Sequence, residues 1–395
     1  MTKLWEKGVG FDKKIESFTV GNDNDLDQIL LPYDCEASIA HVKMLNKMKY
    51  LNDNESQKLI KELNFILEES KNGNFKIKKS HEDCHTAIED QLVNTCGDSG
   101  KKIHTARSRN DQVLTALRLY YRESIDDVKK LLIDLIKSLE LFSDKNGKIQ
   151  FPGYTHMQKA MPSSVQLWSN AYIESMNDDL KLLQTAYALI NQSPLGSGAG
   201  FGVPINIDRK FLAKELKFDS VQDNPIYCQL SRGKFELYII NIFTQIMFSI
   251  NRIASDIVLF CTDEFKFFSL PDEFCSGSSI MPNKRNPDVL ELLRGSYSIL
   301  IGYQSQIQSL SQNLISGYNR DIQLSKEPTM RSFDLIKNCL DINTLVISGL
   351  IVNEENCKKA MTDELFATEQ AYNMVKEGIP FRQAYRKIAD ELIKK

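Results

Sequence analysis

Residues 122–142 read RESIDDVKKLLIDLIKSLELF, and the spacing of their apolar side chains decides the fold class. Successive members of the apolar series are three, four, three, four and three positions apart: Ile125, Val128, Leu132, Leu135, Leu139 and Phe142. This alternation places one apolar stripe on a single helix face, where it can pack against neighbouring helices. The stretch therefore predicts a long helix inside a bundle.

Less strict forms of the same periodicity extend this prediction over much of the chain. They cover residues 165–189, 289–314 and 333–352, with glycine and proline concentrated between them. Strand-like alternation is scarce. The sequence thus predicts an all-α protein whose middle is a bundle of long helices. With the family resemblance described below, this implies an elongated protein of three domains: a helical N-terminal domain (residues 1–105), the central bundle (106–352) and a small helical C-terminal domain (353–395).

Residues 237–260 need separate treatment because they are apolar on nearly every side, as a membrane span would be. Arg252 and Asp256 fall inside this segment, and Asn241, Gln245 and Asn251 interrupt it. A helix that is apolar all round is equally typical of a core surrounded by other helices. We therefore predict a buried bundle helix that is covered partly by other subunits.

The overall composition excludes several classes of partner. The 395 residues contain 49 Lys plus Arg and 52 Asp plus Glu, so the net charge of -3 gives no reason to expect nucleic acid or an anionic membrane. The eight cysteines form no C-x-x-C pair, as is typical of reduced thiols. Because the N-terminus also lacks the apolar region of a secretory signal, a cytoplasmic protein is predicted.

The stretch HEDCH, residues 81–85, matches the H-E-x-x-H motif of zinc proteases. On a helix this spacing sets two imidazoles on one face beside a glutamate. Five residues match by chance often, however, and no glutamate lies between Glu89 and Glu123 to act as a downstream third ligand. A metalloprotease is therefore the weaker alternative.

The most specific stretch is GSSIMPNKRNP, residues 277–287. Its small residues would let a loop move over a ligand, and its two hydroxyls, lysine and asparagine amide are anion-binding groups. Asn286 suits a helix N-cap, and Pro287 suits the first helical turn. The alternative is a Ser/Gly connector before a helix.

This loop resembles the signature of the fumarase, aspartase and argininosuccinate lyase superfamily, whose members release fumarate. Three further segments resemble the argininosuccinate lyase forms of shared motifs: IHTARSRNDQV (103–113), PGYTHMQKAMPSS (152–164) and SGYNRDIQLSKE (316–327). The resemblance runs from LWEKG (4–8) to PFRQAY (380–385). In this family the HEDCH region reads E-D-x-H-x-x-I-E, so His81 completes the protease pattern by accident, and the resemblance implies neither a metal nor an organic cofactor.

The resemblance to argininosuccinate lyases implies a β-elimination that cleaves argininosuccinate into arginine and fumarate. It assigns proton transfer to Ser278 and His156, and we favour Ser278 as base and His156 as acid, with the direction left open. Lys284 would stabilise the developing negative charge, and Glu291 would orient the histidine.

The same resemblance implies substrate binding by Asn110, Thr155, Asn286, Tyr318, Gln323 and Lys326, which supply groups suited to three carboxylates and a guanidinium. Arg107 and Arg109 would add positive charge, although one of them could instead brace the loop through backbone carbonyls. The family forms homotetramers whose subunits share active sites, which fits the all-round apolar segment.

Three departures from the family pattern stand out. Ala106 replaces a usual glycine, so a positive φ there would be strained. The C-terminal domain is short, and FTVGND (18–23) replaces a serine-containing stretch that contacts substrate in some relatives. The rival interpretations are adenylosuccinate lyase, aspartase, an inactive crystallin-like relative and a helical scaffold without an ancestral site. The SRNDQ and GYNRDIQ segments argue against the first two, and intact His156 and Ser278 argue against the third.

Overall fold

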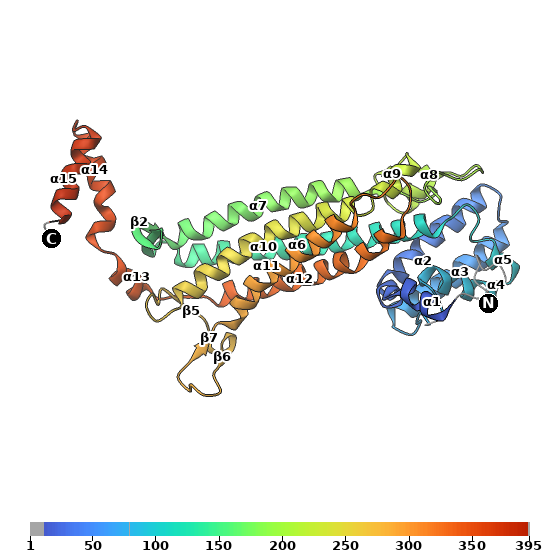
Figure 1. Ribbon diagram of the computed structural model, residues 1–395, viewed down its shortest axis with the longest axis horizontal. Helices are drawn as coiled ribbons and strands as arrows, with labels where there is room; N and C mark the ends of the chain where they lie inside the picture. The colour runs from blue at the N-terminus through green and yellow to red at the C-terminus, as the bar shows by residue number, and fades with distance from the viewer. Residues whose placement is uncertain (1–11, 79, 394–395) are drawn as a thin grey trace. The chain divides into compact units, whose positions relative to one another are not determined.

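The computed structural model describes residues 12–78 and 80–393, and these are mostly helical (Figure 1). Five long helices form the bundle: α6 (Arg109–Asn146), α7 (Val165–Ile190), α10 (Lys234–Phe260), α11 (Asp288–Leu310) and α12 (Lys326–Gly349). The prediction of an all-α fold built on long helices is therefore confirmed. The LWEKG segment lies outside the described residues.

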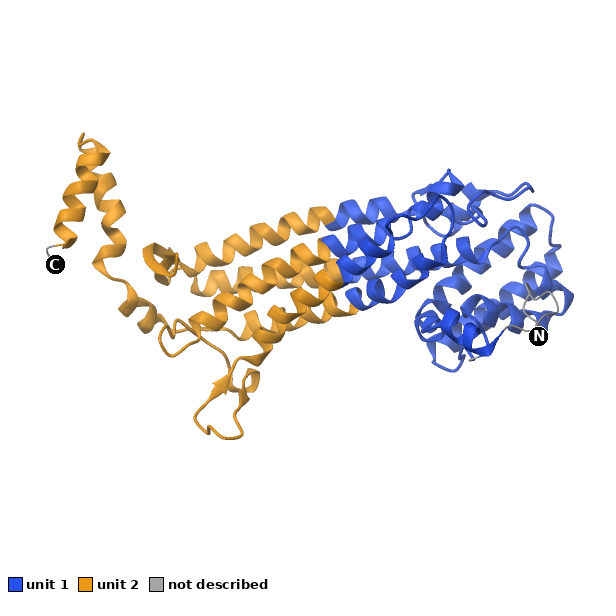
Figure 2. Cartoon of the chain, viewed as in Figure 1, with its two compact units in different colours: residues 1–127, 183–241, 303–333 blue, residues 128–182, 242–302, 334–395 orange. Residues whose placement is uncertain are grey.

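The chain divides into two compact units (Figure 2). Unit 1 comprises residues 1–127, 183–241 and 303–333, and unit 2 comprises residues 128–182, 242–302 and 334–395. The divisions fall inside the five long helices, so each unit contains part of every one. The three-domain division with boundaries after residues 105 and 352 stays a prediction.

Unit 1 contains the N-terminal helices and several short elements. These are α1 (Lys13–Val20), α2 (Asp23–Lys47), α3 (Asp53–Lys71), α4 (Cys84–Cys96), α5 (Asp98–Lys101), α8 (Arg209–Glu215), α9 (Pro225–Leu230), the 3-10 helix η2 (Arg320–Ser325), and the parallel strands β3 (Gln192–Ser193) and β4 (Ser220–Val221). Leu45, Leu59 and Leu63 are fully buried where α2 packs on α3. Asn52 begins α3 with a reciprocal capping box to Glu55.

Unit 2 adds short hairpins and the C-terminal helices to its part of the bundle. The elements are β1 (Gln150–Thr155) antiparallel to β2 (Gln158–Ser164), β5 (Phe268–Ser269) antiparallel to β8 (Ile351–Val352), β6 (Ser276–Gly277) antiparallel to β7 (Arg285–Asn286), the 3-10 helices η1 (Asp272–Phe274) and η3 (Asp363–Phe366), and α13 (Glu354–Ala360), α14 (Ala367–Lys376) and α15 (Phe381–Ile393). The β1–β2 hairpin packs against α13 and η3.

The apolar stripe predicted on α6 is buried along its whole length. Its six residues, Ile125, Val128, Leu132, Leu135, Leu139 and Phe142, are each no more than 5% exposed. Elsewhere in unit 2, Asp256 on α10 accepts hydrogen bonds from Trp168 Nε1 (2.9 Å) and the Tyr172 hydroxyl (2.7 Å) on α7. The bundle thus combines an apolar seam with a partly buried carboxylate that accepts two hydrogen bonds.

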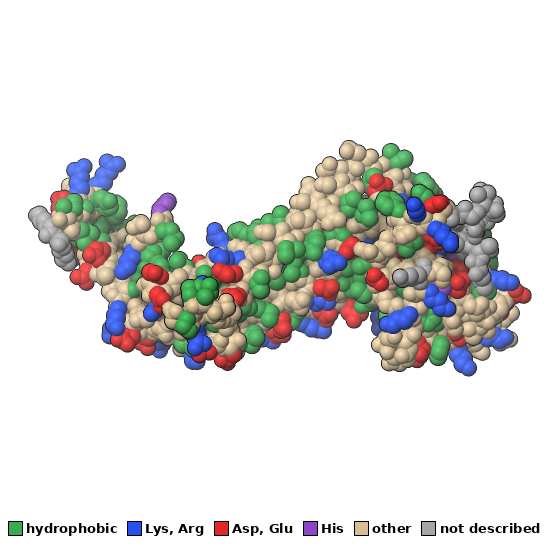
Figure 3. Space-filling model, turned by 60° about the horizontal axis from the view of Figure 1, so that its bottom comes forward, with side chains coloured by type: hydrophobic (Ala, Val, Ile, Leu, Met, Phe, Trp, Pro, Cys, Tyr) green, Lys and Arg blue, Asp and Glu red, His purple; other side chains and the backbone are tan. Residues whose placement is uncertain are grey.

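Helix α10 has the length and apolar composition of a membrane span, but its burial is that of a core helix. Together with α9 it forms the one described segment that passes this test, and more than half of its most apolar window is buried inside the chain. Ile246, Ile250 and Ile253 are fully buried. Figure 3 shows apolar side chains among polar ones on the surface of the long helices. The exposed apolar residues on the long helices of unit 2 include Leu167, Phe248 and Leu345.

Candidate active site

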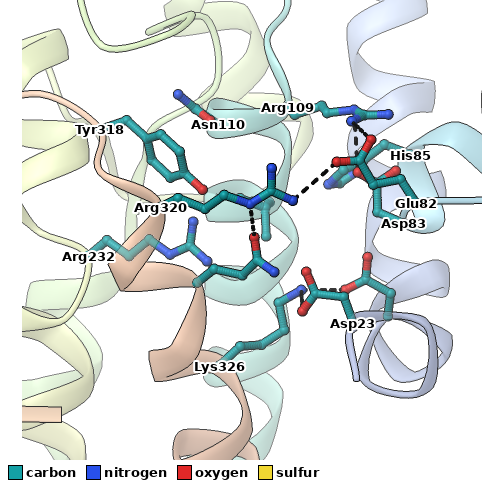
Figure 4. Close-up of a pocket in the computed structure, with 13 residues that line it drawn as sticks. Asp23, Glu82, Asp83, His85, Arg109, Asn110, Arg232, Tyr318, Arg320 and Lys326 are labelled. Carbon is teal, nitrogen blue, oxygen red and sulfur yellow. Dashed lines mark hydrogen bonds and ion pairs between the residues drawn. The ribbon is translucent and has the colours of Figure 1, made fainter. Parts of the chain in front are cut away.

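A charged pocket of about 160 Å³ lies in unit 1 (Figure 4). It collects four of the residues predicted to bind substrate: Asn110, Tyr318, Gln323 and Lys326. Asn110 lies in the first turn of α6, Gln323 lies on η2, and Lys326 is the first residue of α12. Segments more than 200 residues apart in the sequence therefore meet around one cavity.

Lys326 is held by two carboxylates from the N-terminal region. Its ammonium donates to Asp27 Oδ1 at 2.6 Å and to Asp23 Oδ1 at 3.0 Å. Burial of Lys326 opposes its charged form, but Asp27 and Asp23 outweigh this and raise the pKa of the lysine. Burial alone would raise the pKa of the Asp27 carboxyl, but the attraction of Lys326 outweighs burial and lowers this pKa. Two of the three ammonium hydrogens are thus committed, and one is left for a ligand.

His85 also lines the pocket, and a buried carboxylate fixes its orientation. His85 Nδ1 lies 2.8 Å from Asp34 Oδ2. Burial opposes the charged imidazole, but Asp34 outweighs it and raises the pKa of His85. This contact through Nδ1 fixes the orientation of the ring.

The HEDCH stretch does not form the geometry of a zinc protease. Helix α4 begins at Cys84, so His81 precedes the helix and does not share a helix face with His85. His81 Nε2 instead lies 3.5 Å from Asp90. Asp34, Cys84 and His85 do place one donor atom each within 4.8 Å of one another. Burial raises the pKa of the Cys84 thiol well above its usual value.

The two arginines of the ARSRND segment, residues 106–111, make different contacts. Arg109 lines the pocket, where its guanidinium contacts Glu82 (2.6 Å) and Asp83 (3.3 Å). Arg107 is buried and donates to Ser38 Oγ at 2.8 Å. Arg107 is therefore the bracing residue, although it braces a side chain and not the predicted backbone carbonyls.

The SRND turn is locked to a second loop by Asp111. This buried carboxylate accepts backbone N–H groups from Ser108 (2.9 Å), Gly196 (3.0 Å) and Gly198 (2.9 Å). Burial raises the pKa of Asp111 to about 6 despite these donors. Ala106, just before the motif, has φ 61°, so the strained positive φ anticipated from its missing glycine is present.

The residue predicted to transfer a proton in the GYTHMQ motif lies at the tip of the β1–β2 hairpin in unit 2. Strand pairing ends at Thr155 and Gln158, which leaves His156 and Met157 as a two-residue turn. Both have positive φ, 52° and 59°, the backbone that such turns require and that glycine or asparagine usually supplies. His156 and Thr155 are exposed. Strained backbone of this kind is typical of functional positions.

Ser278 lies on the loop between β6 and β7, also in unit 2. Its Oγ accepts backbone N–H groups from Met281 (3.1 Å) and, more weakly, Ile280 (3.4 Å). Two amides aimed at this oxygen would stabilise negative charge on it. Lys284 on the same loop is exposed, and exposed Glu291 lies 3.9 Å from Arg294.

The N-cap predicted at Asn286 is wrong. Asn286 belongs to strand β7, where its backbone pairs with Ser276, and α11 begins at Asp288. Pairing with a strand ten residues earlier thus overrides the local capping preference of asparagine.

The predicted residues separate into two groups. Asn110, Tyr318, Gln323 and Lys326 meet at the pocket of unit 1. Unit 2 contains the other six: Thr155, His156, Ser278, Lys284, Asn286 and Glu291. Figure 1 shows the β1–β2 hairpin and the β6–β7 loop as separate projections of unit 2.

The sequence motifs predict no role for several residues that line the pocket. They are Asp23, Asp27, Glu82, Asp83, His85, Arg232 and Arg320. Buried Arg232 lies over the Tyr318 ring at 5.9 Å, and Arg320 contacts Glu82 at 3.3 Å. Glu82, Asp83 and His85 belong to the E-D-x-H-x-x-I-E motif, which could have identified them as site residues. Arg232 and Asp27 stand in no motif that marks them.

Comparison with known proteins agrees with this arrangement of motifs. A lyase family matches residues 10–302. The argininosuccinate lyase of Thermotoga neapolitana is 49% identical over 389 residues, which cover 98% of each chain. The chain belongs to the argininosuccinate lyase family. The argininosuccinate lyase of Sorangium cellulosum is 41% identical and is covered over 90% of its length.

Solved structures share the fold of this chain. An EDDS lyase in complex with formate matches with a TM-score of 0.83 at 24% identity, over 98% of this chain and 77% of that one. The class II fumarase of Schistosoma mansoni matches with a TM-score of 0.79 at 15% identity, over 95% and 91% of the two chains. At these identities the likeness shows the fold alone.

Proposed function

We infer that this protein is an argininosuccinate lyase, which cleaves argininosuccinate into arginine and fumarate and so serves arginine biosynthesis. The observation that carries this conclusion is the 49% identity to the Thermotoga neapolitana enzyme over nearly the whole of both chains. About half of the aligned residues differ between the two proteins, yet the alignment covers 98% of each chain. Both the fold and the reaction can be retained under such changes.

The charges of the pocket suit this substrate. Argininosuccinate carries three carboxylates together with a guanidinium and an ammonium group. The pocket offers the cations Arg232, Arg320 and Lys326 for carboxylates, and it offers Glu82 and Asp83 for cationic groups. Charge-assisted hydrogen bonds of both kinds would fix the two ends of such a ligand.

We propose that Ser278 removes the carbon-bound proton and that His156 protonates the departing guanidino nitrogen. The amides of Ile280 and Met281 support this role for Ser278, because they stabilise the oxyanion that a basic serine must form. Lys284 would add positive charge near the developing carboxylate charge, and Glu291 would stabilise charged His156. Thr155 and Asn286 would complete substrate binding beside these residues.

We further propose a cytoplasmic homotetramer in which different subunits contribute the parts of each active site. Two features support this assembly: the exposed apolar side chains on the unit 2 helices, and the exposure of His156 at a hairpin tip. Surfaces of this kind are typical of interfaces between subunits.

The test is to incubate purified protein separately with argininosuccinate, adenylosuccinate and aspartate and to follow fumarate by its ultraviolet absorbance. We expect release from argininosuccinate alone. Release only from one of the other two substrates would overturn the substrate assignment, and release from none would favour an inactive crystallin-like relative.

A further inference from the structure

The turn between α1 and α2 is tied to the pocket by polar contacts. We call residues 19–23 the strap. The backbone carbonyl of Thr19 accepts hydrogen bonds from Arg320 Nη2 (3.0 Å) and Gln323 Nε2 (3.1 Å). At the other end of the strap, Asp23 Oδ1 accepts one from Lys326 (3.0 Å). Between these two contacts, Asn22 Nδ2 donates to Glu327 Oε2 at 3.4 Å, so the strap is fastened to η2 and α12 at three points.

These contacts use donors that the proposed function assigns to the substrate. The Gln323 amide and the Lys326 ammonium are expected to bind a carboxylate, and in this structure they bind a carbonyl and a carboxylate of the chain itself. Carbonyl and carboxylate oxygens compete for the same N–H hydrogens. A ligand carboxylate that uses these donors must therefore share or replace the strap.

Of the two acids on Lys326, Asp23 is the more easily replaced. Asp27 is fully buried, contacts the ammonium at 2.6 Å and also accepts the Cys84 backbone N–H at 3.0 Å. Asp23 is only partly buried and makes the longer contact. Asp27 can therefore hold Lys326 in place when Asp23 leaves.

The strap also contains a residue that can act as its hinge. Gly21 ends α1 with φ 56° and ψ -129°, a conformation that other residues rarely adopt. A Cβ at this position would meet no heavy atom within 4 Å. A substitution at Gly21 therefore strains the strap backbone without a steric clash.

We propose that the strap is a self-bound lid, which occupies Gln323 and Lys326 when the pocket is empty and is displaced when a dicarboxylate binds there. The proposal rests on the proposed function, because that function assigns these donors to the substrate. Displacement makes the strap a competitor of the ligand, so weakening the strap tightens binding.

The first test is Asp23→Asn, with binding of fumarate measured by isothermal titration calorimetry on the intact protein. A neutral amide binds Lys326 less tightly and removes a negative charge from beside the incoming anion. We expect fumarate to bind about fivefold more tightly, the scale of one partly buried charge contact. Asp25→Asn is the matched control, since Asp25 is an exposed acid in the same helical turn and should change nothing. Unchanged or weaker binding in Asp23→Asn overturns the proposal.

The second test is Gly21→Ala, which loosens the strap through its backbone and leaves every pocket charge in place. We expect fumarate affinity to rise about threefold or more, because the alanine disfavours the closed φ. Hydrogen exchange of the amides of residues 19–23 should also accelerate when wild-type protein is saturated with fumarate. Unchanged affinity in Gly21→Ala, or amides that become more protected with fumarate, contradicts a displaced lid.

Failure of this proposal is separable from failure of the proposed function. Turnover of argininosuccinate by the wild-type protein tests the function alone, whereas fumarate affinity in the two strap variants does not depend on turnover. Circular dichroism of each variant establishes that it folds.

Discussion

The pocket of unit 1 and the proton-transfer segments of unit 2 differ in how firmly the chain itself holds them. Lys326, His85 and Arg109 each have at least one carboxylate partner within 3 Å and are wholly or partly buried. His156 and Lys284 are exposed. Under the proposed roles, a single chain arranges the binding groups, whereas the proposed reacting groups would need other surfaces to exclude water from them.

The sharpest way to test this division is to remove the reacting hydroxyl. Ser278→Ala should lower kcat by about 1000-fold or more, because losing the base and its stabilised oxyanion removes the proton-abstraction step. Helicity and oligomer size should not change, because the loop contributes little to the core.

Fumarate release measured for Ser278→Ala against Ser279→Ala provides the contrast, since Ser279 is the exposed neighbouring hydroxyl on the same loop. Comparable activity in both variants would remove Ser278 from the mechanism.

In unit 1, replacing the buried lysine of the pocket should lower the free energy of unfolding as well as weaken substrate binding. Lys326→Ala leaves Asp23 and Asp27 without their shared cation, and breaking a buried ion pair in this way costs about 3 kcal/mol or more. Urea unfolding at pH 7.5 measures this loss.

A second substitution identifies its cause. Adding Asp27→Asn to Lys326→Ala removes the uncompensated charge and should restore part of the lost free energy of unfolding. If the double variant is no more stable than the single one, the loss comes from packing and not from the orphaned carboxylate.

Each unit contains a buried carboxylate, and the two carboxylates differ in how many hydrogen bonds they accept. Asp111 in unit 1 accepts three backbone N–H groups, whereas Asp179 Oδ2 in unit 2 is buried with no hydrogen-bond partner among the described residues. Burial raises the pKa of Asp179 to about 7. The folded state therefore retains a proton that the unfolded state loses above about pH 4, so this group's contribution to stability falls as pH rises from about 4 to 7.

Substituting each of these acids should therefore have opposite effects. Asp179→Asn should stabilise the protein by about 2 kcal/mol at pH 8 and by little at pH 4. Asp111→Asn should destabilise it by about 2 kcal/mol at pH 8, because an amide cannot accept all three N–H groups. Thermal unfolding at the two pH values measures both, and a pH-independent effect of Asp179→Asn would refute the assignment.

The smallest expected effect concerns backbone strain beside the SRND motif. Ala106→Gly should raise the free energy of unfolding by about 1 kcal/mol, because glycine adopts φ 61° without the Cβ penalty. Ala116→Gly, inside helix α6, should lower it. A stabilised Ala116→Gly or a destabilised Ala106→Gly in chemical denaturation would contradict this account.

Local patterns allowed the bundle to be predicted from the sequence. The stripe from Ile125 to Phe142 repeats within one helix, so its burial follows from spacing alone. The positive φ of Ala106 was likewise signalled by one residue in a motif. The predicted N-cap at Asn286 failed because pairing with Ser276 is not a local property.

The pocket was only partly predictable for the same reason. The family motifs identified Lys326 and Gln323, but nothing near Asp23 or Asp27 in the sequence indicates that these acids contact Lys326. Arg232 gave no signal either, because an arginine before a helix is common and its position over Tyr318 depends on the packing of distant segments. The roles of the predicted residues at both regions stay predictions.

The contact between Asp27 and Lys326 spans 299 positions of the chain, and this order of synthesis has a consequence for the newborn protein. At about 5–20 residues per second, a ribosome needs roughly 15–60 seconds to supply the cation after it has made the anion. During that interval the emerging N-terminal helices cannot bury Asp27 in its final form. The ion pair that joins the first helices to the last long helix can therefore form only late in synthesis.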